Sequence, residues 1–341
     1  MIRFNKPTIG KRDLESVLYC MIGDDLTPGN YLREFTKMLS DHFSTRNIAV
    51  FNSYFFCYEV AFQFLDLSKG DEVIIPSYAR YGILHSIMKS GLKPIVVDVD
   101  IETLMPERSQ VRAKVGKKTG CMIIPQMFGI PNEFDDYREF GIPIIEDLDG
   151  CIWAKVNGKL AGSFGDYAVV GFNDYSQITT GGGGGLISRS NKLSPWLKQF
   201  MSYNHGLDYL MSDFNASLGV SQMKNLPKNI ETRIRIGRYY DDAVYNSGCG
   251  FVGRRENREI SYSCYVVSTE TPFPEIEKFF KKEGIPVKRA IEKPLHQFLE
   301  MDDIEFPATM ELYRKTIALP IYPTLDRRSV ESIAKGIRAI L

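Results

Sequence analysis

An α/β protein with a mostly parallel sheet is the fold class that this 341-residue sequence predicts. Between about residues 45 and 190, short and nearly continuous apolar runs alternate with helical or irregular segments. Strands of a parallel sheet have this composition when helices cover both faces, because each strand is then buried on both sides. Longer helical segments and fewer strand-like runs follow residue 190. We therefore expect a large α/β domain followed by a smaller α+β domain.

The first predicted element is an amphipathic helix at residues 11–22, and TPGN at 27–30 predicts a loop. One face of that helix carries Leu14, Val17, Leu18 and Met21. Four buried strands are predicted next: VIIP at 73–76, KPIVVDVD at 93–100, GCMIIPQ at 120–126 and PIIED at 143–147.

Acidic residues stand at the ends of two of these strands. Asp98 and Asp100 follow the second apolar run, and Glu146 and Asp147 end the fourth. Open parallel sheets bind their ligands at the carboxyl ends of the strands. Asp147 is therefore a candidate ligand-binding residue. The alternative, a carboxylate that only caps a strand end, is equally compatible with the sequence.

Helices dominate the second half of the sequence. Two are predicted, at 211–226 and 229–244, the first with Ser212 and Asp213 as cap residues. A strand at 261–269 and the helix EIEKFFKKEG come next, and a closing helix has an apolar stripe of Val330, Ile333, Ile337 and Leu341. These patterns predict a large domain at 1–225 and a small α+β domain at 226–341.

Composition excludes several classes of function. The 42 basic and 42 acidic residues balance, which argues against a nucleic-acid or membrane-surface protein. No window reaches the ~20 apolar residues of a membrane span, and the polar start MIRFNKPTIG does not resemble a signal peptide. The six cysteines and four histidines lack metal-ligand spacing, so we expect no metal, no disulfide framework and a cytoplasmic location.

A series of ordered segments resembles the DegT/DnrJ/EryC1/StrS family of sugar aminotransferases. The segments are GDEVIIPSY at 70–78, KPIVVDVDIETL at 93–104, GCMIIPQMFGIP at 120–131, PIIEDLDG at 143–150, GSFGDYAVVGF at 162–172, and the later KPLHQF and ALPIYPTLD. The resemblance implies a fold-type-I enzyme that uses pyridoxal phosphate (PLP) to aminate nucleotide-linked keto sugars. It also implies polysaccharide biosynthesis as the setting and a homodimer with its sites at the subunit interface.

The residue that departs most from the family pattern is the Schiff-base lysine. In the stretch VGFNDYSQITTGG its position falls at Ser176, followed by Gln177, and no lysine lies between Lys159 and Lys192. A serine hydroxyl cannot form the imine on which PLP-dependent transamination depends. The resemblance thus predicts the fold while the site residue argues against the activity.

The turn that holds the PLP phosphate in the family is also changed. It falls at Ser53, Tyr54 and Phe55, where bulky rings replace a glycine and a threonine and occupy the space of the phosphate. The alternative is that these aromatic residues simply plug the core. Four further family residues are replaced in this sequence. Arg80 stands in place of the aromatic residue that stacks on the cofactor ring, and Gly150 in place of a glutamine. Gly171 stands in place of a phosphate-binding serine, and Asp208 in place of an asparagine contributed across the dimer.

Only Asp147, the implied partner of the pyridine nitrogen, keeps the family residue. Arg80 could pair with Asp147 or Asp149, and Asn173 adds a polar side chain to the altered cleft.

The hypothesis that these changes favour is a non-catalytic or repurposed homologue with no expected cofactor. It would bind a sugar nucleotide, or pair with an active paralogue in place of a second copy of itself. Two alternatives remain. One is an enzyme with PLP-independent chemistry in the altered cleft, and the other is a transaminase-like protein that binds PLP without a covalent bond.

Overall fold

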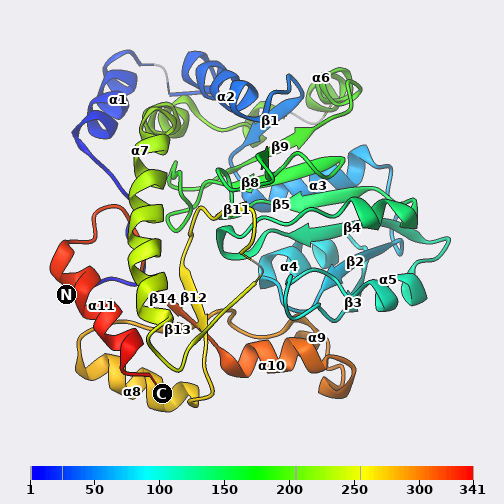
Figure 1. Ribbon diagram of the computed structural model, residues 1–341. Helices are drawn as coiled ribbons and strands as arrows, with labels where there is room; N and C mark the ends of the chain where they lie inside the picture. The colour runs from blue at the N-terminus through cyan, green and yellow to red at the C-terminus, as the bar shows by residue number, and fades with distance from the viewer. Residues whose placement is uncertain (1, 25, 204–205, 254, 341) are drawn as a thin grey trace.

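A seven-stranded sheet lies at the centre of the computed structural model, which describes residues 2–24, 26–203, 206–253 and 255–340 (Figure 1). In spatial order its strands are β1 (Ile48–Phe51), β9 (Gly184–Ser188), β8 (Tyr167–Gly171), β5 (Ile144–Asp147), β4 (Thr119–Pro125), β2 (Glu72–Pro76) and β3 (Lys93–Val97). From β3 to β8 neighbouring strands are parallel, whereas β9 is antiparallel to both β8 and β1. The mostly parallel sheet confirms the predicted fold class.

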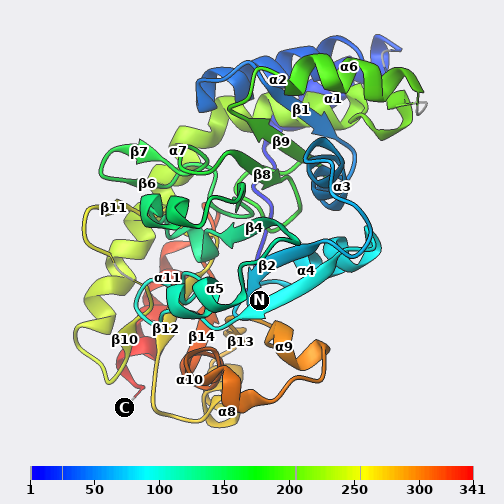
Figure 2. The ribbon, with the colours of Figure 1, turned by 90° about the vertical axis from the view of Figure 1, so that its right-hand side faces the viewer.

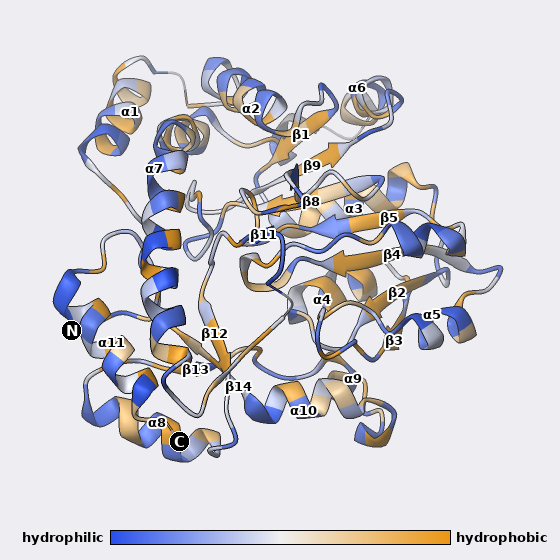
Figure 3. Cartoon of the chain, in the orientation of Figure 1, coloured by the Kyte–Doolittle hydropathy of each residue, from blue (hydrophilic) through white to orange (hydrophobic). Residues whose placement is uncertain are grey.

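Helices cover both faces of this sheet, which explains the nearly continuous apolar runs of its strands. Val73 and Ile75 of β2 belong to the core that includes α3 (Tyr54–Phe64) and α4 (Tyr81–Lys89), while Ile74 belongs to the core that includes α5 (Arg108–Lys114). Figure 3 shows the hydrophobic composition of the central strands, which is typical of strands buried on both faces. The remaining helices of the first 203 residues are α1 (Lys11–Ile22), α2 (Asn30–Phe43) and α6 (Leu193–Tyr203).

A single helix, α7 (Asp213–Val244), replaces the two helices predicted at 211–226 and 229–244. The sequence suggested a break because Pro227 cannot donate the backbone hydrogen bond of a helix interior. Leu226 and Ile230, on either side of the proline, are buried, and this burial carries the helix through the missing bond. The prediction of two helices was wrong. The predicted domain boundary after residue 225 falls inside α7, and the division into domains stays a prediction.

The second half of the chain adds a smaller antiparallel sheet (Figure 2). Its strands, in spatial order, are β10 (Gly250–Phe251), β12 (Tyr265–Ser268), β14 (Thr316–Leu319) and β13 (Lys288–Arg289). The helices of this part are α8 (Phe273–Lys282), α9 (Leu295–Phe298), α10 (Pro307–Lys315) and α11 (Arg327–Arg338). A three-stranded sheet of β11 (Arg258–Glu259), β6 (Lys155–Val156) and β7 (Lys159–Leu160) joins this part of the chain to the loops of the large sheet.

Short 3₁₀ helices complete the structure at Met127–Gly129, Asp135–Phe140, Gly206–Tyr209 and Asp303–Glu305. Within the described ranges, no helix combines the length and the apolar character that a bilayer crossing requires. In the same ranges, no group of three or more histidine, cysteine or carboxylate side chains is arranged to hold a metal ion.

Candidate functional site

A cavity of about 760 Å³ lies between the carboxyl edge of the large sheet and the small antiparallel sheet. From the first half of the chain it is lined by Phe55, Arg80, Tyr81, His85 and Tyr175, among others. Lys288, Arg289 and Lys293, from β13 and the segment behind it, line the opposite side. The cavity therefore brings together residues that lie more than 200 positions apart in the sequence.

Asp147 ends β5 and is nearly inaccessible, with 3% of its surface exposed, so it does not itself line the cavity. One of its carboxylate oxygens, Oδ1, accepts a hydrogen bond from the Tyr54 hydroxyl at 2.6 Å and another from the Asp149 backbone N–H at 2.9 Å. Burial, with the nearby charge of Asp149, raises the pKa of Asp147 to about 6. Burial also raises the pKa of Tyr54 and Tyr58, whose hydroxyls are 3.2 Å apart, so both remain protonated phenols.

Asp149 is the centre of a second polar cluster. It forms an ion pair with Arg80, the residue immediately before α4, and the guanidinium carbon lies 5.2 Å from the ring centre of Tyr175. Of the two partners that the sequence suggested for Arg80, the structure selects Asp149. The Asp149 side chain is buried, and the ion pair supplies the counter-charge that a buried carboxylate requires.

Ser176 joins the same cluster. Its hydroxyl donates to Asp149 Oδ1 at 3.0 Å and accepts from the Asn173 backbone N–H at 3.2 Å. The Asn173 side chain donates to the Tyr175 hydroxyl at 3.1 Å, which closes the turn around Ser176. The nearest ionisable partner of Ser176 is thus a carboxylate already paired with Arg80, and no general base of the kind used by a Ser–His pair is bonded to it.

The turn at residues 53–55 begins α3. The Ser53 hydroxyl accepts from the Phe56 backbone N–H at 3.4 Å, so the helix start is capped by its own side chain. Tyr54 is buried, whereas Phe55 is 40% exposed and lines the cavity. The alternative that both rings plug the core therefore fails for Phe55, which is partly exposed and lines the cavity.

Of the predicted site residues, Phe55 and Arg80 line the cavity, whereas Gln177 and Asp208 have structural partners outside it. The Gln177 amide donates to the Ser261 carbonyl and hydroxyl at 3.0 and 2.7 Å, and its oxygen accepts from the Ile152 N–H. Asp208 is exposed in a 3₁₀ turn, and its carbonyl accepts from the Asn52 side chain at 2.7 Å. Gln177 thus links the two halves of the chain, and Asp208 positions the residue before the 53–55 turn.

Gly150 and Gly171 lie close to the two carboxylates. Gly150 has a positive φ of 81°, which a side-chain-bearing residue rarely adopts. A Cβ atom on Gly171 would lie 2.8 Å from Asp149 Oδ1. The residues that stand here in the family pattern, a glutamine and a serine, would not fit this arrangement.

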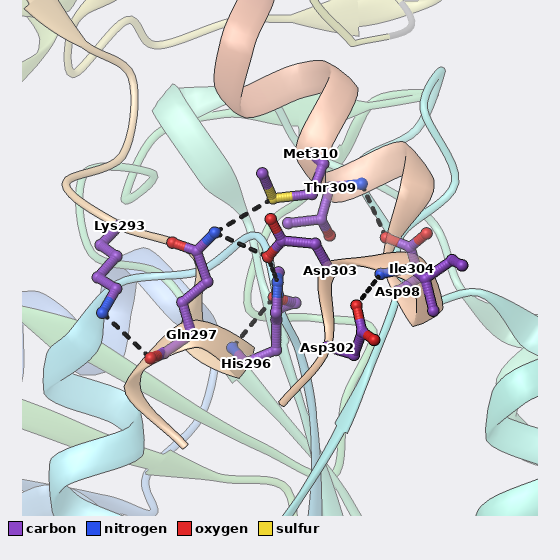
Figure 4. A network of polar contacts seen from close by, with 10 residues as sticks. Asp98, Lys293, His296, Gln297, Asp302, Asp303, Ile304, Thr309 and Met310 are labelled. Carbon is purple, nitrogen blue, oxygen red and sulfur yellow. Dashed lines mark hydrogen bonds and ion pairs between the residues drawn. The ribbon is translucent and has the colours of Figure 1, made fainter. Parts of the chain in front are cut away.

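The sequence analysis missed a buried relay of polar side chains at the start of α9 (Figure 4). His296 bonds to the Ser77 hydroxyl through Nδ1 at 2.6 Å and to Asp303 through Nε2 at 2.8 Å. Ser77 and His296 are fully buried, and His296 stacks on Phe306 with 4.1 Å between ring centres. We assign this relay a structural role because a substrate cannot reach the serine. The motif KPLHQF marks the histidine, but its serine partner lies 219 residues away.

Asp98, the other acidic strand end, also has a structural role. Its carboxylate accepts from the Ala308 and Thr309 backbone N–H groups at 2.9 and 2.8 Å and caps the start of α10. This bond is visible in Figure 4, where Asp98 lies beside Thr309. Asp98 thus caps the start of a helix, whereas Asp147 is buried and bonded to the Tyr54 hydroxyl and the Asp149 N–H.

Pyridoxal phosphate, the cofactor that the family resemblance implies, does not fit the residues at this site. Ser176 occupies the position of the amine and is bonded to Asp149, and the Tyr54 hydroxyl already occupies the hydrogen-bonding position on Asp147. No space remains beside Gly171, where Asp149 and the Tyr54 ring are in contact distance. The site therefore offers neither the amine nor the open carboxylate oxygen that pyridoxal phosphate requires.

Comparisons with known proteins support the resemblance over nearly the whole chain. The model of the DegT/DnrJ/EryC1/StrS aminotransferase family matches residues 7–338. The chain is 25% identical to a dTDP-4-dehydro-2,3,6-trideoxy-D-glucose 4-aminotransferase of Saccharopolyspora spinosa, with 98% of this chain and 95% of the relative covered. It is 24% identical to the GDP-perosamine synthase of Escherichia coli O157:H7, with 97% and 96% covered.

Solved structures agree with the fold. The aminotransferase TlmJ from Streptoalloteichus hindustanus superimposes with a TM-score of 0.90 at 23% identity, covering 99% of this chain and 98% of that one. The PLP form of the putative sugar aminotransferase Spr1654 from Streptococcus pneumoniae gives a TM-score of 0.91 at 23% identity, with 99% and 97% covered. At these identities the structural likeness establishes the fold alone.

Proposed function

We propose that this chain, which belongs to the DegT/DnrJ/EryC1/StrS aminotransferase family, serves nucleotide-sugar biosynthesis without forming a Schiff base with PLP. The observation that carries the proposal is the hydroxyl of Ser176, which stands at the lysine position and is bonded to Asp149 at 3.0 Å. A hydroxyl cannot exchange nitrogen with a substrate, so the protein acts as a ligand-binding homologue of active transaminases. The relatives themselves are named for such activities.

The ligand that suits the remaining cavity is a sugar nucleotide. Lys288, Arg289 and Lys293 line the cavity, and none of them forms an ion pair with a carboxylate in the described part of the chain. Their groups contact aromatic rings or carbonyls: Lys288 Nζ lies 4.7 Å from the Phe4 ring centre, for example. Cations without a counter-ion bind phosphate well, and an exposed ring such as that of Phe55 offers a stacking surface for a base or sugar.

Thermal unfolding in the presence of nucleotide-linked hexoses tests this proposal. A sugar nucleotide at ~100-fold its Kd is expected to stabilise the protein by roughly 2.7 kcal/mol. The combined substitution of Lys288 and Lys293 by alanine should abolish the shift. Lys89→Ala is the matched control, because Lys89 is exposed and paired with Glu59 outside the cavity. No stabilisation by dTDP-, GDP- or UDP-linked sugars, or an equal loss in the control, would contradict the proposal.

A second copy of the chain is the partner that we propose. The outward face of α1 carries apolar side chains that are each more than half exposed: Leu14, Leu18, Tyr19, Met21 and Ile22. Helix α1 packs on α7 with its other side and lies at the edge of the molecule in Figure 1. An apolar face of this kind marks an interaction surface, and homodimers are the arrangement that the resemblance implies.

Light scattering coupled to size-exclusion chromatography tests the assembly. We expect a dimer for the unmodified protein and a monomer for Leu18→Lys. Lys335→Glu, at an exposed position on α11, changes charge outside the apolar face of α1 and should remain dimeric. If the unmodified protein is a monomer and forms a larger complex only when an active paralogue is added, the homodimer is contradicted and a heteromer takes its place.

A further inference from the structure

Tyr54 and Phe55, two of the bulky residues at the cleft, each pack against a glycine. A Cβ atom on Gly171 would lie 3.2 Å from Tyr54 Cδ2, and a Cβ atom on Gly82 would lie 2.9 Å from Phe55 Cζ. Real Cβ contacts are rarely this short, so a side chain on Gly82 would displace the Phe55 ring, and one on Gly171 would require the Tyr54 ring to shift by a few tenths of an ångström. The large and small residues therefore form complementary pairs.

Tyr54 is the member of these pairs that lies nearest the chemistry. It is 6% exposed, and the glycine at position 184 lets β9 approach so closely that a Cβ atom there would be 2.8 Å from Tyr54 Cα. Its hydroxyl points at Asp147 Oδ1 over 2.6 Å. The ring and the hydroxyl are thus fixed from three sides, by β8, β9 and the end of β5.

Asp147 requires a donor because it is buried, and the tyrosine supplies one from within the chain. A buried carboxylate without a hydrogen bond would be strongly unfavourable. In this structure Oδ1 already receives the Tyr54 hydroxyl and the Asp149 N–H. An external heterocycle with a protonated nitrogen would have to displace the phenol before it could reach the same oxygen.

We propose that Tyr54 determines the cofactor specificity of this cleft, as an internal occupant that excludes pyridoxal phosphate and bonds to Asp147 in place of the cofactor's pyridine nitrogen. The proposal rests on the proposed function and names the residue responsible. Pyridoxal phosphate is then excluded by the shape of the cleft, which Tyr54 and Gly171 determine together. This exclusion does not depend on the missing lysine.

Pyridoxamine phosphate is the probe that separates these effects, because it has the ring and the phosphate of the cofactor and needs no Schiff base. Isothermal titration calorimetry would compare the unmodified protein, Tyr54→Phe and Tyr54→Gly, with Tyr58→Phe as a control that removes a neighbouring phenol without opening the space beside Gly171. We expect no binding to the unmodified protein or to either phenylalanine variant. Tyr54→Gly should bind the probe about tenfold or more tightly than the upper limit of affinity measured for the unmodified protein, because it frees both the ring space and the Asp147 oxygen.

Three results would overturn the assignment to Tyr54. They are binding of pyridoxamine phosphate by the unmodified protein, binding by Tyr54→Phe as tight as that by Tyr54→Gly, or no detectable binding by a folded Tyr54→Gly variant. Circular dichroism establishes folding, and Tyr54→Ala, which retains a Cβ for the helix turn, replaces the glycine variant if that one does not fold. The outcomes also separate the two proposals. A Schiff base on the unmodified protein contradicts the proposed function, whereas its absence together with no gain in Tyr54→Gly or Tyr54→Ala contradicts only the role of Tyr54.

Discussion

Replacement of Asp147 by asparagine is predicted to stabilise this protein, although it removes the one cofactor-binding residue retained from the family pattern. Asp147 accepts both of its hydrogen bonds through Oδ1, from the Tyr54 hydroxyl and the Asp149 N–H. An asparagine carbonyl oxygen can accept the same two bonds. The substitution therefore keeps the contacts and removes a negative charge that is buried beside Asp149.

The magnitude follows from the pKa of Asp147, which rises from 3.8 to about 6 in the folded protein. Below pH 3.8 the carboxyl is protonated in both states, and it contributes no pH dependence. Between the two values the folded protein holds a proton that the unfolded chain has released, so stability falls as the pH rises. Above pH 6 the full difference is reached, about 3 kcal/mol, because each pKa unit corresponds to about 1.36 kcal/mol.

Urea unfolding at pH 5 and pH 8, followed by fluorescence, measures this effect. We expect Asp147→Asn to raise the free energy of unfolding by about 1–3 kcal/mol at pH 8 and by less at pH 5. Asp149→Asn is the matched control with the opposite sign, because it removes the counter-ion of Arg80 and should destabilise the protein. An Asp147→Asn variant that is less stable than the unmodified protein at pH 8 would refute the reasoning.

Three further predictions concern the packing around the cleft. Arg80→Ala should lower the free energy of unfolding by about 2–4 kcal/mol, because it leaves the buried carboxylate of Asp149 unpaired. Arg80→Lys should lower the free energy of unfolding by less, and urea unfolding midpoints measure both effects. In the unmodified protein the Phe55 ring fills the space that the methyl group of Gly82→Ala would need, so this substitution should stabilise α4, by about 0.5–1 kcal/mol, only when Phe55 is also replaced by alanine. A double-mutant cycle of unfolding free energies measures this coupling. Asp213→Ala should lower the free energy of unfolding by about 3 kcal/mol or more, because the fully buried carboxylate accepts hydrogen bonds from three backbone N–H groups at and just before the start of α2. Thermal unfolding would show this loss as a lower midpoint or as the absence of a cooperative transition.

Periodicity and the carboxyl-edge rule predicted much of the fold. The apolar runs at 73–76 and 143–147 correspond closely to β2 and β5, because a strand buried on both faces leaves a nearly continuous apolar signature. The helix predicted at 11–22 has the same bounds in the structure. The prediction failed at Pro227, where the local preference for a break is outweighed by the buried contacts of α7. Burial by distant residues is invisible to local pattern analysis.

The candidate site was predictable as a set of residues and unpredictable as a set of contacts. Comparison with the family pattern brought Tyr54, Asp147, Gly171 and Ser176 to attention. It did not show that the Tyr54 hydroxyl reaches Asp147 across 93 residues, or that Gly171 is the position that accommodates the tyrosine ring. Such pairings depend on how β5, β8 and α3 meet in space, which one sequence does not encode in any local spacing.

Incubation of the purified protein with PLP, followed by borohydride reduction and peptide mass mapping, tests the central claim most directly. The account predicts no Schiff-base absorbance band and no reduced PLP adduct on any peptide that lines the cleft, because Ser176 offers only a hydroxyl and Tyr54 occupies the ring position. A visible band that borohydride abolishes, with the adduct mapped to a cleft lysine such as Lys288 or Lys293, would contradict it.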